Sequence, residues 1–428
     1  MAGFHGGGSP QGIQGIPQEV PQVRPYGRTK EGWQMSKRLR VAVLGATGSV
    51  GRQALEVLDT FRDRFEVVSL AARASVEDME AAIRRFKPAS VAMTDEQAAE
   101  KLRESAAAEG CRVLEGPDGL CELAADENAD CVLAATAGSS GVKAVWTAVN
   151  CGKLVALANK EALVIAGGPI TKAAASNGAR LLPVDSEHAA AHQLLEHVPR
   201  EHVRRLILTA SGGPFLEWSR EKLEKVDAST ALDHPRWNMG PKISIDSATM
   251  VNKGFEVIEA RWLFDLPEEK IDVLIHPQSI AHAIVEMADG AMVSQMAAPD
   301  MRIPIAYALS YPDRLELPAR IDNTRPLRLD HQRLDFLPLR NDQFPALELC
   351  RRALRAGGGT TAAFCSADEV FVNAFLEGRI RFTRIVELLG RLLELLRPLP
   401  GDSLEDCLSA AEQGSRLARE LLEREPQP

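Results

Sequence analysis

Short apolar segments alternate with helical patterns from Arg38 to about Asp185. Alternation of strand and helix predicts βα units, whose strands lie parallel in one sheet with helices on both faces. The predicted helices include Val50–Thr60 and Val76–Phe86, and the predicted strands are Arg40–Leu44, Phe65–Ala71, Ser90–Met93, Cys131–Ala135, Leu154–Leu157 and Leu181–Val184. The sequence therefore predicts an N-terminal Rossmann-type parallel sheet.

The first predicted strand leads into the loop Gly45-Ala46-Thr47-Gly48-Ser49-Val50-Gly51, and this loop opens a helix. Glycines permit a tight turn and close backbone approach, and a helix N-terminus attracts a pyrophosphate. Three glycines alone are a weak signal, but the strand, the helix and the following βα units supply the required context. We therefore predict a dinucleotide site in which Thr47, Gly48, Ser49 and Val50 contact the phosphates.

The second strand ends in Leu70-Ala71-Ala72-Arg73, without the carboxylate that usually binds the ribose 2′-hydroxyl of NAD. Arg73 can pair with a 2′-phosphate, which favours NADP over NAD. The alternative is a solvated surface arginine. Ala134-Ala135-Thr136-Ala137-Gly138 follows a later strand, and we expect Ala135 to line the nicotinamide side, although small residues there also suit helix packing.

Two carboxylates, Asp185 and Glu187, follow the predicted strand Leu181–Val184. If the chain stays extended, their i, i+2 spacing places both side chains on one face, where they suit Mg²⁺ or Mn²⁺. The alternative is helix capping, with Asp185 or Ser186 as the cap and Glu187 in the first turn.

A third carboxylate favours the metal site over capping alone. Glu256 lies in a segment predicted to be helical from about Ala248, and Asn252 and Lys253 share its helix face. A surface helix needs only a Lys253–Glu256 pair, so the additional polar residues indicate a binding site.

Hydroxyl, amide and ammonium donors in the same region suit a phosphate group. The predicted phosphate cradle consists of Ser211, Ser247, Asn252 and Lys253. Gly and Pro stand near both ends of residues 211–241, as in a flap that closes over a substrate. Trp237 and Met239 are expected to form an apolar lid and His234 a polar contact. The alternative is a structural loop with a buried Trp.

Residues beyond Asp185 predict a central α/β catalytic domain with a second sheet and then a helical bundle. Helix His188–His197 and strands Arg205–Thr209, Asp272–Ile275, Ala281–Met287 and Met292–Gln295 belong to the former. Ile385, Leu388, Leu389 and Leu392 recur at helical spacing in the latter, and Ser403 with Asp406 predicts a capping box. The predicted organisation is a tail at 1–36, an NADPH-binding domain at 37–185, a metal-binding and catalytic domain at 186–315, a linker at 316–344 and helices at 345–428.

Composition excludes several kinds of protein. The formal net charge of −9 argues against a nucleic-acid partner, and no apolar run approaches the roughly 20 residues of a membrane span. The seven cysteines form no Cys-x-x-Cys pair, which predicts free thiols in a reducing cytoplasm. Residues 1–36, rich in Gly, Pro and Gln, are expected to be a disordered tail or to precede a true start at Met35.

The chain from Lys37 to Glu425 resembles the 1-deoxy-D-xylulose 5-phosphate reductoisomerase family. The resemblance rests on family-specific motifs whose order and spacing also fit. They are the glycine loop, Ala-Asn159-Lys160-Glu161-Ala-Leu, Pro-Val-Asp185-Ser186-Glu187-His188, Ala-Ser211-Gly-Gly-Pro-Phe, the segment His234–Glu256, His276-Pro-Gln-Ser279 and Ala374-Phe-Leu-Glu-Gly-Arg-Ile.

This resemblance implies NADPH- and metal-dependent rearrangement and reduction of 1-deoxy-D-xylulose 5-phosphate to 2-C-methyl-D-erythritol 4-phosphate, in non-mevalonate isoprenoid synthesis. The metal is Mg²⁺ or Mn²⁺, with Co²⁺ as a further option, and the enzyme is expected to be a homodimer. The implied metal ligands are Asp185, Glu187 and Glu256. The implied substrate contacts are Ser186, Lys160 and His234 for the backbone oxygens, the phosphate cradle named above, and Trp237.

The same resemblance suggests a catalytic set and further cofactor contacts. Lys160, Glu187, His234 and Glu256 are the catalytic candidates, and Asn159, Glu161 and Gly240 are added to the cofactor site. Departures from the family pattern occur at Ala72 and Ala74, at Met296–Asp300 and at Cys365–Glu369. The last two are not expected to touch the chemistry.

Two rival interpretations remain open from sequence. One is another two-domain NADP oxidoreductase, such as a semialdehyde or homoserine dehydrogenase, which lacks this metal triad and Trp-bearing flap. The other is an inactive NADPH-binding regulatory protein descended from the enzyme. The filled carboxylate, lysine and serine positions argue against the second rival.

Overall fold

The computed structural model describes residues 38–233, 237, 239–318, 327–330, 332–340 and 342–425. All of them belong to one compact unit, Ser36–Pro428. The expected N-terminal tail, His234 and part of the expected linker therefore lie outside the described residues. In the described part of the chain, no helix combines the length and the apolar character that crossing a membrane requires.

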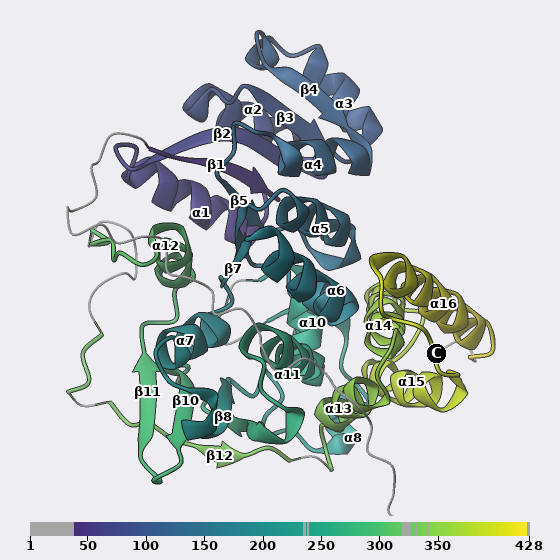
Figure 1. The fold of residues 1–428 in the computed structure, drawn as a ribbon. Coiled ribbons are helices and arrows are strands. Elements are labelled where there is room, and N and C mark those ends of the chain that lie inside the picture. The colour runs from purple at the N-terminus through teal and green to yellow at the C-terminus, as the bar shows by residue number, and fades with distance from the viewer. Residues whose placement is uncertain are drawn as a thin grey trace, which may run out of the picture. The chain divides into compact units, whose positions relative to one another are not determined.

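A seven-stranded sheet forms the N-terminal half, and every neighbouring pair in it is parallel (Figure 1). Its order is β4-β3-β2-β1-β5-β6-β7, so the order reverses between β1 and β5. Ligands of such sheets bind at the carboxyl ends of the strands beside this reversal. The strands are β1 Leu39–Leu44, β2 Phe65–Ala72, β3 Ser90–Met93, β4 Arg112–Glu115, β5 Cys131–Ala134, β6 Leu154–Leu157 and β7 Arg180–Pro183.

The strands predicted for this sheet all exist, within one residue at each end, and the predicted fold class is confirmed. Strand β4 was not predicted. It is an edge strand whose apolar signal is only Val113-Leu114, and its terminal residues Arg112 and Glu115 are exposed. Edge strands carry such charges because they are not covered on both sides.

Helices cover both faces of this sheet, as the alternation of side chains along β1 shows. Val41 and Val43 pack in one core with α1 and α2, whereas Ala42 and Leu44 pack in another with α4 and α5. The helices are α1 Ser49–Thr60, α2 Val76–Phe86, α3 Glu96–Arg103, α4 Gly116–Ala125, α5 Val142–Asn150 and α6 Glu161–Asn177, with the 3-10 turn η2 at Gly138–Gly141.

The second sheet has five strands in the order β11-β10-β8-β9-β12. Only β8 and β9 pair in parallel. Its strands are β8 Val203–Ala210, β9 Ile271–Ile275, β10 Ala281–Met287, β11 Met292–Met296 and β12 Leu337–Pro338. Strand β12 lies within the expected linker. It adds an edge strand to β9.

Helices α7 Ser186–Leu195 and α11 Val251–Phe264 pack on one face of the second sheet, around Leu206, Leu208 and Val285. The remaining helices of this part are α8 Arg220–Leu223, α9 Ala228–Leu232, α10 Pro241–Thr249 and α12 Arg302–Ser310. The expected single helix from about Ala248 is wrong in one respect. Met250 has a φ of +67°, which ends α10, and α11 begins after it.

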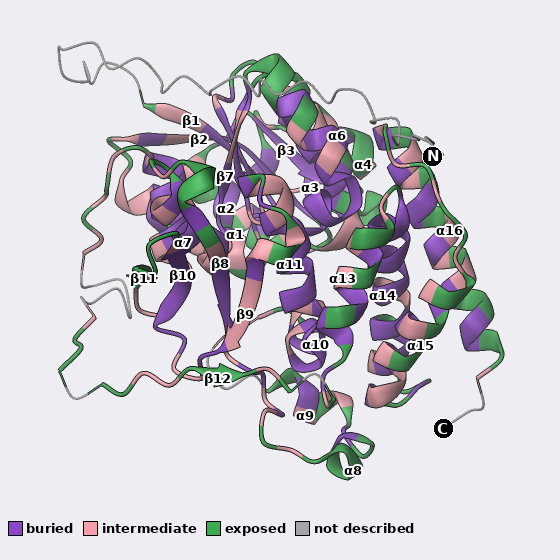
Figure 2. Cartoon of the chain, turned by 60° about the horizontal axis from the view of Figure 1, so that its bottom comes forward, coloured by how far each residue is buried: buried purple, intermediate pink, exposed green. Residues whose placement is uncertain are grey.

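Four helices form the predicted C-terminal bundle: α13 Ala346–Ala356, α14 Thr360–Leu376, α15 Phe382–Leu395 and α16 Leu404–Glu423. The predicted capping box of Ser403 and Asp406 starts α16. Helix α14 is buried along most of its length (Figure 2), because it contacts α16 and α15 within the bundle and α6 and α10 beyond it. The bundle is therefore joined to both other parts through α14.

Candidate active site

A cavity of about 610 Å³ lies between the carboxyl ends of the parallel strands and helices α7, α10 and α11. It is the place where most of the sequence-predicted residues meet. Those that line it are Gly48, Ser49, Val50, Ala135, Lys160, Glu161, Asp185, Ser186, Glu187, Ser211, Trp237, Met239, Gly240, Ser247, Asn252, Lys253 and Glu256. Thr47, Arg73 and Asn159 do not line this cavity.

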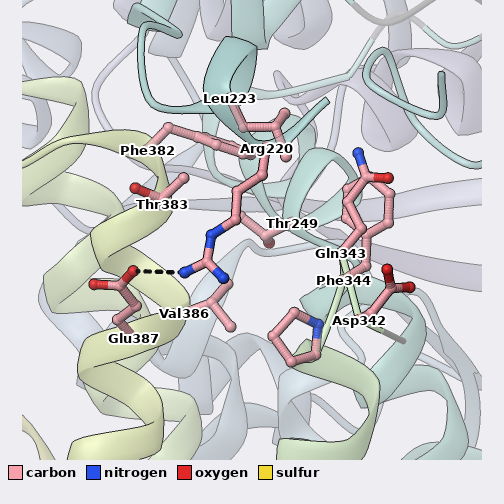
Figure 3. Close-up of a pocket in the computed structure, with 11 residues that line it drawn as sticks. Arg220, Leu223, Thr249, Asp342, Gln343, Phe344, Phe382, Thr383, Val386 and Glu387 are labelled. Carbon is pink, nitrogen blue, oxygen red and sulfur yellow. Dashed lines mark ion pairs between the residues drawn. The ribbon is translucent and has the colours of Figure 1, made fainter. Parts of the chain in front are cut away.

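Another cavity, of about 120 Å³, lies between α8, the start of α13 and α15 (Figure 3). It contains none of the predicted site residues. The Arg220 guanidinium spans it and approaches Glu387 at 3.6 Å. Its walls join the base of the expected flap to the bundle, so we assign it to packing between these parts.

The glycine loop closes at the start of α1 through close backbone contacts. Gly45 has a φ of +93°, and its carbonyl accepts a 3.1 Å hydrogen bond from the Gly48 amide. A Cβ on Gly51 would lie 2.1 Å from the Gly45 carbonyl oxygen. Glycine at position 51 therefore lets the helix approach the strand, and it leaves the N-terminus of α1 facing the cavity.

Gly51→Ala is expected to destabilise the fold by at least about 2 kcal/mol, because the added methyl group meets backbone rather than a movable side chain. Thermal unfolding of the variant and of Gly48→Ala checks this. A Cβ on Gly48 would approach Gly45 only to 3.3 Å, so the control should lose much less. Equal melting temperatures for the two variants would contradict this account of the loop.

Arg73 and Asn159, two predicted cofactor residues that do not line the cavity, differ in burial. Arg73 is exposed directly after β2. Asn159 is buried, and its Nδ2 donates to the carbonyls of Thr136 at 2.7 Å and Gly138 at 2.9 Å. Asn159 thus holds the loop after β5, whose residue Ala135 lines the cavity.

Three carboxylates converge on one side of the cavity. Asp185, Glu187 and Glu256 each place an oxygen within 4.8 Å of the others. Asp185 also caps α7, because its Oδ1 accepts from the Glu187 amide at 3.3 Å. The backbone is therefore not extended here, contrary to the first expectation, and capping coexists with the carboxylate cluster.

Two buried ammonium groups balance these carboxylates. Lys160 Nζ lies 2.7 Å from Asp185 Oδ2 and 3.4 Å from Glu256 Oε1. Lys253 Nζ lies 2.7 Å from Glu187 Oε1 and 2.5 Å from Glu256 Oε2. Asn252 donates to Glu256 Oε1 at 2.7 Å, as the predicted i, i+4 spacing requires. The two lysines therefore hold the three carboxyl groups together.

Burial and neighbouring charges set the pKa values in this cluster. Burial, and next the charge of Glu187, raise the pKa of Glu256 to about 7. Burial opposes ionisation of Asp185 too, but Lys160 and His188 hold its pKa well below the usual range. Burial disfavours the charged form of Lys160, yet Asp185 and Glu256 raise its pKa well above the ordinary value. The pKa values of Asp185 and Glu256 therefore differ strongly within one cluster.

The cluster fits a hard divalent cation. Its donors are carboxylate oxygens from two elements, the ligand type that Mg²⁺ and Mn²⁺ prefer. Some of these oxygens bind the ammonium groups of Lys160 and Lys253 in the chain alone, and those groups must release them when an ion binds. The carboxylate ligands of a metal site, and their negative charge, are thus already gathered in one place.

The predicted phosphate residues come from two sides of the cavity. Ser211 follows β8, and Ser247 lies in the last turn of α10. Gly213 allows these segments to approach, since a Cβ there would lie 3.0 Å from the Ser247 carbonyl oxygen. Lys253 instead directs its ammonium group at the carboxylates and at the Thr209 carbonyl.

Several residues at this site were missed by the sequence reasoning. Gln53, Lys242, Asp246, His282 and Arg302 line the cavity. Lys242, Asp246 and Gln53 had a detectable signal, since they stand in or beside the motifs that were identified. His282 lies on β10 and Arg302 on α12, and their spacing gave no indication of a site.

His188 and Glu259 are buried side chains close to Asp185. The His188 Nδ1 lies 3.4 Å from Asp185 Oδ1 and 3.5 Å from Glu259 Oε2. Its Nε2 lies 2.9 Å from the Glu256 carbonyl oxygen. Burial alone would lower the pKa of His188, but Glu259 and Asp185 raise it to about 9. His188 therefore lies between two carboxyl groups that favour its charged form.

Comparison with known proteins decides the family. Residues 41–167 match the profile of 1-deoxy-D-xylulose 5-phosphate reductoisomerase, 181–264 that of its C-terminal domain, and 296–417 that of the DXP reductoisomerase C-terminal domain. The reductoisomerase of Thermomicrobium roseum is 46% identical over 393 residues, covering 90% of this chain and 98% of its own. This chain belongs to the 1-deoxy-D-xylulose 5-phosphate reductoisomerase family.

Solved structures agree with this assignment. The Zymomonas mobilis reductoisomerase in complex with NADPH is 39% identical, with a TM-score of 0.83 over 91% of this chain and 100% of its own. A reductoisomerase solved with NADPH, fosmidomycin and magnesium is 36% identical, with a TM-score of 0.84 over 90% and 98%. The expected family and fold are confirmed, and the chain is an NADP-dependent oxidoreductase. Neither rival interpretation is needed.

Proposed function

We propose that this enzyme converts 1-deoxy-D-xylulose 5-phosphate to 2-C-methyl-D-erythritol 4-phosphate with NADPH and Mg²⁺, or Mn²⁺ as an alternative. One observation carries the proposal: three converging carboxylates and the glycine loop line the same cavity. A dinucleotide and a metal-bound sugar phosphate can therefore meet in it. Relatives solved with NADPH and with magnesium support both cofactors.

The proposed roles follow from the cavity walls. Asp185, Glu187 and Glu256 hold the ion, which when bound polarises the substrate carbonyl while NADPH supplies hydride. Lys160, which donates to Asp185, and Ser186, which donates to Glu187, would contact the substrate oxygens beside the metal ligands. Ser211, Ser247, Asn252 and Lys253 bind the phosphate, and Trp237 excludes water. His234, outside the described residues, remains a proposed substrate contact and catalytic residue.

We propose that each part of the chain has a role of its own. Residues 37–185 bind NADPH through Gly48, Ser49, Val50 and the loop at Ala135, with Thr47, Arg73, Asn159, Glu161 and Gly240 as further cofactor residues. Residues 186–315 bind the metal and the substrate, and residues 345–428 support the other two parts.

Loss of NADPH absorbance on addition of 1-deoxy-D-xylulose 5-phosphate tests the proposal. Oxidation is expected to require both the sugar phosphate and a divalent ion, to cease with a chelator, and to return when Mg²⁺ or Mn²⁺ is added in excess. Fluorescence of bound NADPH should survive chelation, because the carboxylates do not belong to the glycine loop. Undiminished oxidation after chelation would contradict the metal assignment, and binding of NADPH without any oxidation would favour a regulatory protein.

We propose further that the enzyme is a cytoplasmic homodimer. All seven cysteines are free, which supports a reducing compartment. Strand β11 is an edge of the second sheet, and its Met292, Val293 and Met296 are 57%, 44% and 39% exposed. An apolar edge strand of this kind favours pairing with a second copy of the chain.

Val293→Lys is therefore expected to shift the enzyme toward monomer, because a charge on the shared edge opposes pairing of two copies. Sedimentation velocity over a range of concentrations measures the shift. Leu395→Lys serves as the control, since Leu395 is a 50% exposed residue of the bundle. A monomeric wild type, or a Val293→Lys dimer of unchanged affinity, would exclude this edge as the interface.

A further inference from the structure

Helix α14 of the bundle reaches two walls of the cavity through neighbouring carboxylates. Glu369 contacts η2, which follows the cavity-lining loop at Ala135–Ala137. Asp368 contacts Lys242 near the start of α10, which forms another wall of the cavity. Two consecutive residues of a helix outside the nucleotide-binding sheet thus hold both walls.

Glu369 fixes the loop after β5 with two hydrogen bonds. Its Oε1 accepts from the Ser139 amide at 2.6 Å, and its Oε2 accepts from the Ser139 hydroxyl at 3.0 Å. Gly138 has a φ of +70°, and a Cβ there would lie 2.6 Å from Glu369 Oε1. The carboxylate therefore meets the backbone directly, and Asn159 holds the same loop through the Gly138 carbonyl.

Asp368 fixes the second wall, at α10, by an ion pair. The Lys242 ammonium lies 2.7 Å from Asp368 Oδ2 and 2.5 Å from Asp246 Oδ2. Asp246 is on the same helix as Lys242, whereas Asp368 joins this ammonium to α14, and the ammonium also lies 5.0 Å from the centre of the Phe255 ring on α11. The sequence departure at Cys365–Glu369 was expected to lie away from the chemistry, but its residue Asp368 contacts a lysine of the cavity wall.

The buried carboxylates of Asp368 and Asp246 contribute less to the free energy of unfolding than apolar side chains would. Asp368 and Asp246 are 0% and 2% exposed. Among the described residues, the Oδ1 atom of each has no hydrogen-bond partner. Buried ion pairs with unsatisfied oxygens contribute little net stability and can be replaced by apolar packing. Their place at a cavity wall points instead to a role in geometry.

We propose that Asp368 and Glu369 are positioning residues for the cofactor. They fix Lys242 and the loop at Ser139, and thereby set the separation of the two walls between which NADPH lies. The bundle thus controls cofactor affinity without touching the metal or the sugar phosphate. This inference rests on the proposed function, because it assumes that NADPH binds in this cavity.

NADPH affinity of paired variants tests the inference. Fluorescence titration without substrate is applied to wild type, Glu369→Ala, Glu369→Gln, Asp368→Ala and Asp368→Asn. Each Ala variant should weaken NADPH binding by at least about tenfold, as loss of a hydrogen bond to a charged group does. The Gln and Asn variants retain an acceptor oxygen for Ser139 and Lys242 and should stay within about threefold of wild type. Asn373→Ala, an exposed change on the same helix, is the control.

Steady-state kinetics and thermal unfolding separate positioning from folding. The KM for NADPH should rise in both Ala variants, whereas the KM for the sugar phosphate should stay unchanged in Glu369→Ala, because the loop at Ser139 holds no residue of the phosphate cradle. Ala variants that bind NADPH like wild type would overturn the inference. So would an equal loss of affinity for both substrates with a lowered melting temperature and no recovery in the Gln and Asn variants. A wild type that fails to bind NADPH would overturn the proposed function itself.

Discussion

Glu256→Gln is expected to lower turnover by about a thousandfold or more, equivalent to about 4 kcal/mol of lost transition-state stabilisation. Glu256 is 1% exposed and is the only one of the three clustered carboxylates on α11. Glutamine keeps the size, and its one amide oxygen can still accept from Asn252 or from Lys253, but it lacks the charge that holds a divalent ion.

Direct metal titration and NADPH fluorescence separate the causes of that loss. Mn²⁺ binding should weaken strongly, whereas NADPH affinity and the melting temperature should remain close to those of the wild type. Glu286→Gln is the matched control, because Glu286 is also a buried carboxylate but pairs with Arg204 and Arg205 on the second sheet. Turnover near the wild-type rate in Glu256→Gln would disprove the metal assignment.

Lys253→Ala is expected to raise the KM for the sugar phosphate by about 30- to 100-fold. This factor corresponds to the loss of about 2 to 3 kcal/mol, as expected for a charge-assisted contact with a phosphate. The prediction discriminates between two roles. In the chain alone Lys253 binds Glu187, Glu256 and the Thr209 carbonyl, so it also compensates the carboxylates. If it binds phosphate in the complex, it must turn from these partners when the metal enters.

Metal affinity tells the two roles of Lys253 apart. Removal of the ammonium group leaves Glu187 and Glu256 less compensated, so Mn²⁺ binding should be as tight as in wild type or tighter. An unchanged KM with tighter metal binding would show that Lys253 only balances charge. Lys270→Ala is the control, because Lys270 donates to the Val203 carbonyl away from the cavity.

Local sequence patterns predicted the parallel sheet well because their determinants lie within a few residues. The strands were found from their apolar runs, and β4 was missed because its two central apolar residues gave too short a signal. The contact between Asn252 and Glu256 followed from helical spacing alone. The break at Met250 was not predictable, because a methionine rarely adopts a positive φ and no local pattern announces it.

By itself, the sequence determined the nucleotide-binding fold, the family and the chemical types of the site residues, because these depend on periodicity and on motifs within one segment. Only the tertiary structure decided which groups meet. Lys253 faces Glu187 across 66 positions, and Lys242 meets Asp368 across 126. Such pairings depend on how helices from separate segments pack, and side-chain directions over these separations leave no local trace in the sequence.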